Sequence, residues 1–88
     1  MSLDDYWGNR TDRLNFVKID VEGAEAAVLK GMKRVMRRDR PILLVELHAF
    51  DSWRENHPAL QIIRDFNYAV SYLGRRRGEM HILAQPKE

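Results

Sequence analysis

Two carboxylates follow a stretch whose alternating pattern predicts a β-strand. Residues 15–21 carry apolar side chains at alternate positions, and Asp20 and Glu22 lie at the carboxyl end of this stretch, just before Gly23. In open α/β sheets, ligands bind in the crevice outside the carboxyl ends of the strands. We therefore expect Asp20 and Glu22 to line a ligand-facing rim, where Gly23 lets the backbone approach a ligand closely. The alternative is that these carboxylates only cap the helix that follows.

Lys18 lies two residues before Asp20, so both side chains point to the same side of the expected strand. An unpaired lysine inside a sheet is costly, because its charge loses hydration without gaining a partner. We therefore expect Lys18 to form an ion pair with Asp20 or with Glu46. The alternative is that Lys18 acts as a catalytic base.

The next strand ends in a second pair of polar side chains, Glu46 and His48, which share one side. An imidazole with an ordinary pKa near ~6.5 suits proton transfer, so His48 is a candidate base. Glu46, His48 and Trp53, which lies in the loop that follows, are the candidate substrate-binding residues. With Asp20 and Glu22, Glu46 and His48 make a possible oxygen-and-imidazole cluster for a divalent ion. The interpretation we adopt is a polar rim without a metal, because these side chains match no defined ligand spacing. His81, in the last expected strand, is interpreted as structural.

The expected elements alternate between strands and helices. The pattern predicts a strand over residues 15–21, a helix over 24–38, a strand over 41–47, a loop over 49–57, a helix over 58–67, and strands over 69–73 and 80–84. Residues 1–14 read as a polar, turn-like segment. The alternation favours a parallel sheet with helices on its faces, ending in an antiparallel hairpin. We therefore predict an α/β fold, half of a doubly wound, Rossmann-like sheet, in which the apolar strand over 41–47 is buried on both faces.

The composition fits one small domain. The chain has 88 residues, of which 44% are hydrophobic, with a formal net charge of +2 and no cysteine. Such a length allows a thin core that no disulfide supports. The longest apolar run is far shorter than the ~18–20 residues that span a membrane, so a cytoplasmic protein is expected. Arginines cluster at residues 75–77, but no aromatic side chains interleave with them, which disfavours nucleic-acid binding.

One long stretch resembles a known family signature. Residues 18–25 read Lys-Ile-Asp-Val-Glu-Gly-Ala-Glu, and residues 29–31 read Leu-Lys-Gly. Together they resemble the signature of the FkbM family of S-adenosylmethionine-dependent methyltransferases. Two flanking segments fit the same family, Ser-Leu-Asp-Asp at residues 2–5 and Arg-Pro-Ile-Leu-Leu-Val-Glu-Leu-His at residues 40–48. Beyond residue 48, only the general helix–hairpin plan agrees.

The resemblance implies a class I methyltransferase fold, in which a seven-stranded sheet binds S-adenosylmethionine above its first strands and ends in a hairpin. Residues 1–88 would form the C-terminal part of one such domain and supply its fourth to seventh strands. The N-terminal, cofactor-binding half is then absent, since no G-x-G pattern occurs in the chain. We therefore expect the chain to be inactive by itself.

The resemblance also implies roles for individual residues. Members of the family methylate hydroxyl oxygens of sugars, polyketides and similar acceptors, so a small-molecule or glycan acceptor is expected here. Asp20, Glu22 and Gly23 would lie at the rim of the cofactor pocket. Catalysis would involve Asp20, Glu22, Lys18 or His48, by orienting the acceptor or by taking its proton.

Two other classes of function stay open. The chain could be a non-catalytic interaction module, whose exposed strand edge at residues 15–21 pairs with the missing N-terminal half or with a second copy. It could also be a basic RNA-binding domain, which we rank lowest.

Overall fold

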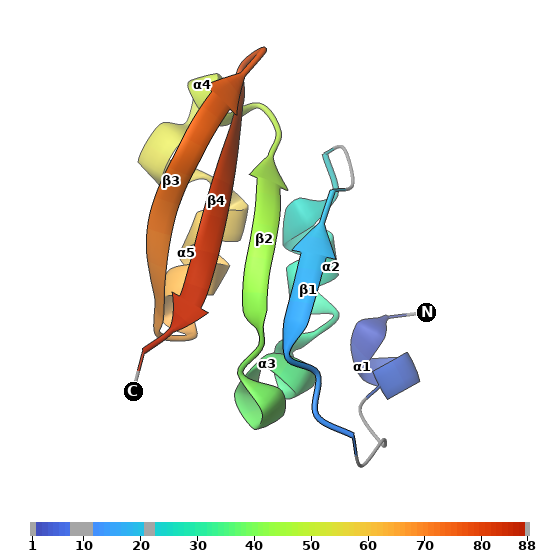
Figure 1. The fold of residues 1–88 in the computed structure, drawn as a ribbon. Coiled ribbons are helices and arrows are strands. Elements are labelled where there is room, and N and C mark those ends of the chain that lie inside the picture. The colour runs from blue at the N-terminus through green and yellow to red at the C-terminus, as the bar shows by residue number, and fades with distance from the viewer. Residues whose placement is uncertain (1, 8–11, 21–22, 88) are drawn as a thin grey trace.

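The computed structural model describes residues 2–7, 12–20 and 23–87, and Figure 1 shows how their helices and strands are arranged. In chain order the elements are α1 (Leu3–Trp7), β1 (Phe16–Ile19), α2 (Glu25–Lys30), α3 (Lys33–Asp39), β2 (Ile42–Leu47), α4 (Phe50–Trp53), the 3-10 helix η1 (Arg54–Asn56), α5 (Pro58–Asp65), β3 (Tyr68–Arg76) and β4 (Glu79–Pro86). None of the described helices is long and apolar enough to cross a membrane.

The four strands form one mixed sheet in the order β1-β2-β4-β3. β1 and β2 run parallel, and β4 is antiparallel to both β2 and β3. The predicted parallel pair and the terminal hairpin are therefore confirmed. Because β1 and β2 are parallel, their carboxyl ends lie at the same edge of the sheet, the upper edge in Figure 1.

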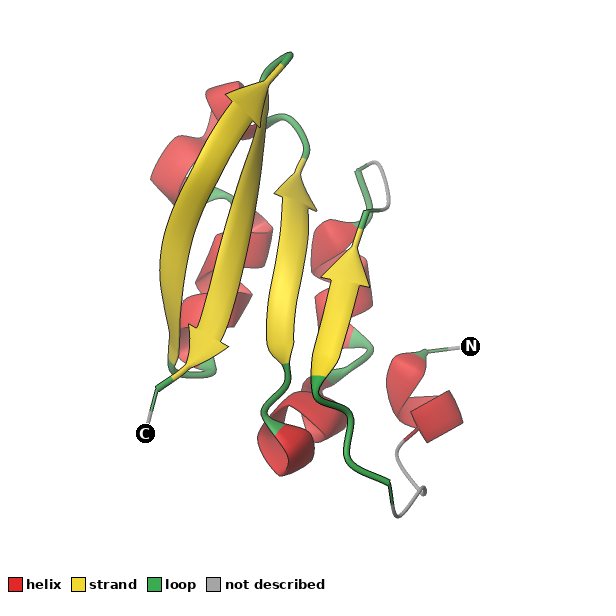
Figure 2. Ribbon diagram, viewed as in Figure 1, coloured by secondary structure: helices red, strands yellow, loops and turns green. Residues whose placement is uncertain are grey.

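Helices α2, α3 and α5 cover one face of the sheet, while the opposite face, turned to the viewer in Figure 2, has no described helix in front of it. On β2, Leu43, Val45 and Leu47 are buried beneath the helices. The residues between them, including Leu44, are only partly buried on the open face. The expectation that this strand is buried on both faces is therefore wrong within the described chain, because helices cover one face only.

The core lies between the sheet and these helices. Its fully buried members come from every layer and include Leu29, Met32, Met36, Leu43, Leu60, Ile63 and Ile82. Burying one such side chain is worth about 1.5–3 kcal/mol relative to leaving it in water. Tyr68 is buried with them and donates a hydrogen bond of 2.7 Å from its hydroxyl to the carbonyl of Pro41, which ties the start of β3 to the start of β2.

The predicted helix over residues 24–38 is two helices, because the chain breaks between α2 and α3. Gly31 lies at the break, where a Cβ would stand 2.8 Å from the Cβ of Ser2, so a side chain has no room there. The Asp4 carboxylate then caps α3 by accepting hydrogen bonds from the backbone N–H of Arg34 (3.0 Å) and Val35 (2.9 Å). The break in the helix is therefore the place where α1 docks.

Helix α1 itself was not predicted, since residues 1–14 read as turn-like. Its start carries a reciprocal cap: Ser2 Oγ accepts a hydrogen bond from the Asp5 N–H (3.1 Å), and Asp5 Oδ2 accepts one from the Ser2 N–H (3.3 Å). The spacing of a serine and an acidic residue three positions later is a sequence signal for a helix start. That signal was present at residues 2–5.

The terminal hairpin is longer than predicted. Residues 74–76, expected in the turn, pair with residues 79–81 of β4, and a register shift between Tyr72 and Gly74 accommodates the extra residue. The turn shrinks to Arg77 and Gly78, whose φ angles are 53° and 81°. Positive φ at both central positions is typical of a type I′ turn, whose twist matches that of the hairpin.

Candidate functional site

Polar side chains from three strands meet at the carboxyl edge of β1 and β2. Asp20 directly follows β1, Glu46 lies near the end of β2, and the pairing of β2 with β4 sets His81 opposite Glu46. Ligand atoms of Asp20, Glu46 and His48 all lie within 4.8 Å of one another, and so do those of Glu46, Glu79 and His81. We call these five side chains the edge cluster. Its central member is Glu46, which belongs to both groups.

Glu46 carries the strongest electrostatic perturbation in the edge cluster. Hydrogen bonding to Glu79 and to Asp20, together with burial and repulsion by both charges, raises the pKa of Glu46 to about 7. Like charges at this distance disfavour simultaneous ionisation, so the cluster retains a proton near neutral pH. The edge is therefore a place that attracts positive charge and can exchange a proton.

His48 is held from behind by a buried carboxylate. Glu25, at the start of α2, is only 2% exposed, and its Oε1 atom lies 3.1 Å from His48 Nδ1 and 2.5 Å from the backbone N–H of His48. Burial acts to lower the pKa of His48, but the hydrogen bond to Glu25 and the nearby negative charges raise it overall. With Nδ1 facing Glu25, the Nε2 atom faces the edge cluster, 3.7 Å from both Glu46 Oε1 and Glu79 Oε1.

A second histidine supports this arrangement. The sequence placed His57 in a loop, yet it is 5% exposed, and its Nδ1 atom accepts a hydrogen bond of 3.1 Å from the backbone N–H of Ala59 at the start of α5. Its Nε2 atom lies 2.8 Å from the carbonyl oxygen of His48. His57 therefore joins α5 to the end of β2 and helps to position His48.

The crevice beside His48 brings together several residues that the sequence singled out. Gly23, Glu25, His48, Trp53 and His57 line a cavity of about 200 Å³ between the turn before α2 and the segment after β2. Trp53 is 50% exposed and belongs to α4, where the sequence predicted a loop. The cavity lies where ligands bind in open α/β sheets.

Glycine is needed at position 23 for the backbone conformation, and not because another described residue comes close to it. Its φ is 77°, a left-handed value that side chains disfavour, and a Cβ there would meet nothing within 4 Å. The turn before α2 therefore needs glycine for its conformation. Glu22, predicted beside it, lies outside the residues that the structure describes.

Lys18 does not form the ion pair that the sequence predicted. Its side chain is exposed on the open face of the sheet, and within the described part of the chain it forms no ion pair with Asp20 or Glu46. The premise of a buried lysine is wrong, because no described helix covers this face and water solvates the ammonium group. Lys18 is therefore not part of the edge cluster.

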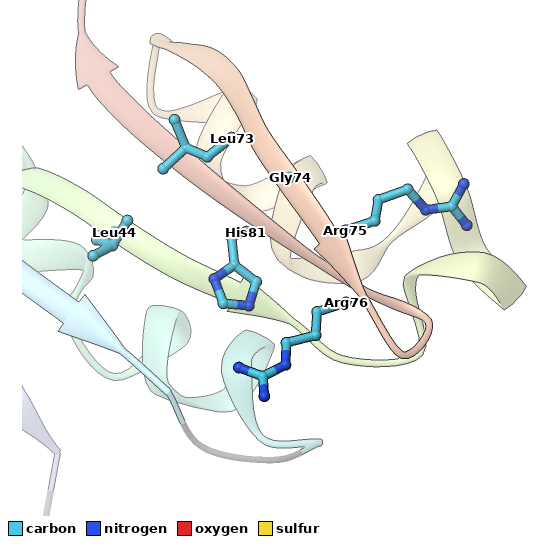
Figure 3. A pocket seen from close by; sticks show the side chains of 6 residues that line it. All are labelled: Leu44, Leu73, Gly74, Arg75, Arg76 and His81. Atoms are coloured by element: carbon cyan, nitrogen blue, oxygen red, sulfur yellow. The ribbon is translucent and has the colours of Figure 1, made fainter.

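A broader hollow lies on the open face next to the edge cluster. Leu44, Leu73, Gly74, Arg76 and His81 are among the residues that line this cavity of about 380 Å³, and Figure 3 shows Arg76 and Arg75 on opposite sides of the hairpin. Arg75 also lines this cavity and forms an ion pair with Asp51 of α4. The sequence did not anticipate that Glu79 and His81 join the site, because their approach depends on the hairpin register.

Comparison with known proteins identifies the family. The model of the family described as "Methyltransferase FkbM domain" matches residues 1–77, which include Asp20, Glu25, Glu46 and His48. Neither the curated proteins nor the solved structures contain a match. The resemblance seen around residues 18–31 is thus confirmed over most of the chain, and the chain belongs to the FkbM methyltransferase domain family.

Proposed function

We propose that the chain takes part in S-adenosylmethionine-dependent methyl transfer to a hydroxyl oxygen of a sugar or natural-product acceptor. The observation that carries the proposal is the His48–Glu25 pair beside the acidic edge of β1 and β2, opening onto a crevice. Family membership supports the reaction type. The acceptor class and the cofactor follow from the family resemblance and are the parts to be tested.

The described residues fit a positively charged methyl donor. S-adenosylmethionine supplies a methyl group bonded to a positively charged sulfur. Asp20, Glu46 and Glu79 concentrate negative charge at the edge of the sheet, which favours a cation there. Asp20 and the Gly23 turn would hold the cofactor from this side, and Glu22 belongs to the same proposed rim.

The acceptor would lie in the crevice lined by His48 and Trp53. His48 Nε2 would accept the proton of the acceptor hydroxyl, while S-adenosylmethionine, when bound, would supply the methyl group. Glu25 holds the ring in the tautomer that keeps Nε2 unprotonated and then stabilises the imidazolium. Much of the rate gain in such a displacement comes from positioning, which the Trp53 indole and Glu46 would supply.

We further propose that additional polypeptide completes the domain by covering the open face and pairing with the free edge of β1, which would make the sheet doubly wound. Two exposed apolar side chains on this face support the proposal, Phe16 at 52% and Leu73 at 56% exposure. Among the described strands, β1 pairs with β2 alone. A missing N-terminal half is the occupant we favour, and a second copy on the β1 edge is the alternative.

Three measurements test these parts. Calorimetric titration of the 88-residue chain with S-adenosylmethionine should show no micromolar binding, and such binding would overturn the proposal that the cofactor site is incomplete. Sedimentation of the chain at high concentration tests the second-copy alternative, which requires a dimer; a clean monomer would exclude it. In a completed domain, His48→Gln should abolish transfer of an isotope-labelled methyl group to hydroxyl acceptors, and undiminished turnover would refute the role of His48.

Nucleic-acid binding has less support. Arg40 donates hydrogen bonds to the carbonyls of Phe66 (2.5 Å) and Asn67 (2.8 Å), so this guanidinium is engaged within the fold. Arg75 is likewise paired with Asp51. Arg40 and Arg75 therefore have structural roles within the fold.

A further inference from the structure

The edge cluster contains more than carboxylates. Alongside Asp20, Glu46 and Glu79 it holds two imidazoles, those of His48 and His81, and Glu46 belongs to both groups of closely spaced donor atoms. Carboxylate oxygen alone suits calcium or magnesium, whereas imidazole nitrogen favours zinc and other transition metals. The mixed donor set distinguishes this edge from an ordinary acidic patch.

The distances between the imidazole nitrogens and the carboxylate oxygens suit an ion rather than direct hydrogen bonds. His48 Nε2 lies 3.7 Å from Glu46 Oε1 and from Glu79 Oε1, and His81 Nε2 lies 3.8 Å from Glu46 Oε1. Hydrogen bonds between such atoms would be about 2.7–3.2 Å long. Metal–ligand bonds of about 2.0–2.2 Å place neighbouring ligand atoms roughly 3.0–3.5 Å apart, so a small contraction would close these donors around an ion.

A buried carboxylate orients one of the imidazoles in the way that metal-binding histidines require. Metal-ligating histidines usually donate their other ring N–H to a carboxylate or carbonyl, which fixes the tautomer and raises ligand basicity. Glu25 Oε1 stands in that position, 3.1 Å from His48 Nδ1, and is itself held by the backbone N–H of His48. The Nε2 atom of His48 is left to face Glu46 and Glu79.

The second imidazole, that of His81, has a ring nitrogen without a hydrogen-bond partner in the edge cluster. His81 Nε2 is shielded from solvent and has no hydrogen-bond partner, although the His81 side chain as a whole is 41% exposed. Shielded polar atoms normally have a partner, and an exception calls for an explanation such as an ion. The orphaned nitrogen lies on the side of the ring nearest Glu46.

We propose that the edge cluster binds a divalent transition-metal ion of the zinc class, with Glu46 as the shared ligand and His48 and His81 as nitrogen ligands. Asp20 and Glu79 supply the remaining carboxylate oxygens. Glu25 is a positioning residue that acts through His48. All of these residues lie on this chain, so the inference does not depend on further polypeptide. Because His48 Nε2 cannot hold zinc and accept a proton at once, the proton transfer proposed for His48 requires the metal-free edge.

Titration of the metal-free 88-residue chain with zinc chloride, and separately with magnesium chloride, tests the proposal by calorimetry in a non-chelating buffer. Zinc should bind at micromolar concentration, while magnesium should bind far more weakly, because it gains little from imidazole ligands. The ¹⁵N resonances of His48 Nε2 and His81 Nε2 should move with zinc. Equal binding of magnesium and zinc, or no binding of zinc, would overturn the proposal.

Variants with little effect on the core locate the ion. Glu46→Gln and His81→Gln change partly exposed side chains on the open face, and each should weaken zinc binding at least about tenfold. Asp65→Asn, an exposed aspartate on α5 far along the chain from the cluster, is the matched control and should bind zinc as the unchanged chain does. Far-UV circular dichroism verifies that each variant folds. Zinc affinity that is unchanged in both cluster variants would refute the assignment.

Discussion

Replacing Asp39 by asparagine should destabilise the chain, with the largest effect near neutral pH. Asp39 ends α3 and is 4% exposed. Its carboxylate accepts hydrogen bonds from Arg38 Nε (2.7 Å) and Nη2 (2.9 Å) and from the backbone N–H of Leu14 (3.0 Å). The charge therefore ties the end of α3 to the segment that leads into β1.

The magnitude follows from the titration of this carboxylate. Its hydrogen bonds, that from Arg38 first, lower the pKa of Asp39 from 3.8 to about 2 against the opposing effect of burial. At about 1.36 kcal/mol for each pH unit, the difference corresponds to about 2 kcal/mol. The Arg38 side chain is 37% exposed, so solvent screens the pair and we expect about 1–2 kcal/mol.

The direction with pH follows from the sign of the shift. Because the pKa of Asp39 is lower in the folded chain, its stabilisation is fully present well above the unfolded value of 3.8 and is lost as the pH falls toward about 2. Asparagine cannot ionise, although it can still accept the hydrogen bond from Leu14. The difference between the two chains should therefore shrink as the solution is acidified.

Urea unfolding followed by tryptophan fluorescence and circular dichroism measures the effect. At pH 7 the Asp39→Asn chain should have a free energy of unfolding lower by about 1–2 kcal/mol, and the difference should nearly vanish at pH 2. Asp65→Asn serves as the control for removal of an exposed charge. Equal stability at pH 7, or a difference that persists unchanged to pH 2, would refute this reasoning.

Three further changes test other parts of the structure. Asp4→Ala removes the cap of α3 and should lower the free energy of unfolding by about 1 kcal/mol in chemical denaturation; no change would mean that α1 does not dock as described. Gly78→Ala places a residue with a Cβ at φ 81° and should lower the free energy of unfolding by about 1–2 kcal/mol; no loss of stability would mean that the hairpin turn has another conformation. Glu25→Gln should lower the pKa of His48 in a nuclear magnetic resonance titration without metal, because the Glu25 carboxylate acts to raise this pKa. An unchanged pKa would mean that Glu25 does not interact with the His48 imidazole.

Local patterns were sufficient to predict much of the fold. Alternating residues located β1, and the proline-led segment located α5, whose observed bounds Pro58–Asp65 lie inside the prediction. The parallel crossover and the terminal hairpin followed from element order alone. Helix α1 follows the capping pattern at residues 2–5, a local signal that marks its start.

Contacts between distant segments explain the remaining differences. The break at Gly31 depends on Ser2, nearly thirty residues away, and no local pattern in the helix reveals it. Exposure of Lys18 depends on which face of the sheet the helices cover. In the candidate site, Asp20, Glu46 and His48 could be grouped from the parallel strands, whereas Glu79 and His81 join them only through the register of β2 with β4.

We propose that the carboxyl edge of β1 and β2 is the ligand-facing rim for a methyl donor. Chemical-shift mapping of the chain at millimolar S-adenosylmethionine tests it directly, with S-adenosylhomocysteine, which lacks the sulfonium charge, as the comparison. We expect the resonances of Asp20, Gly23 and His48 to shift with the first compound and less with the second. Shifts confined to other surfaces, or none at this edge, would contradict it.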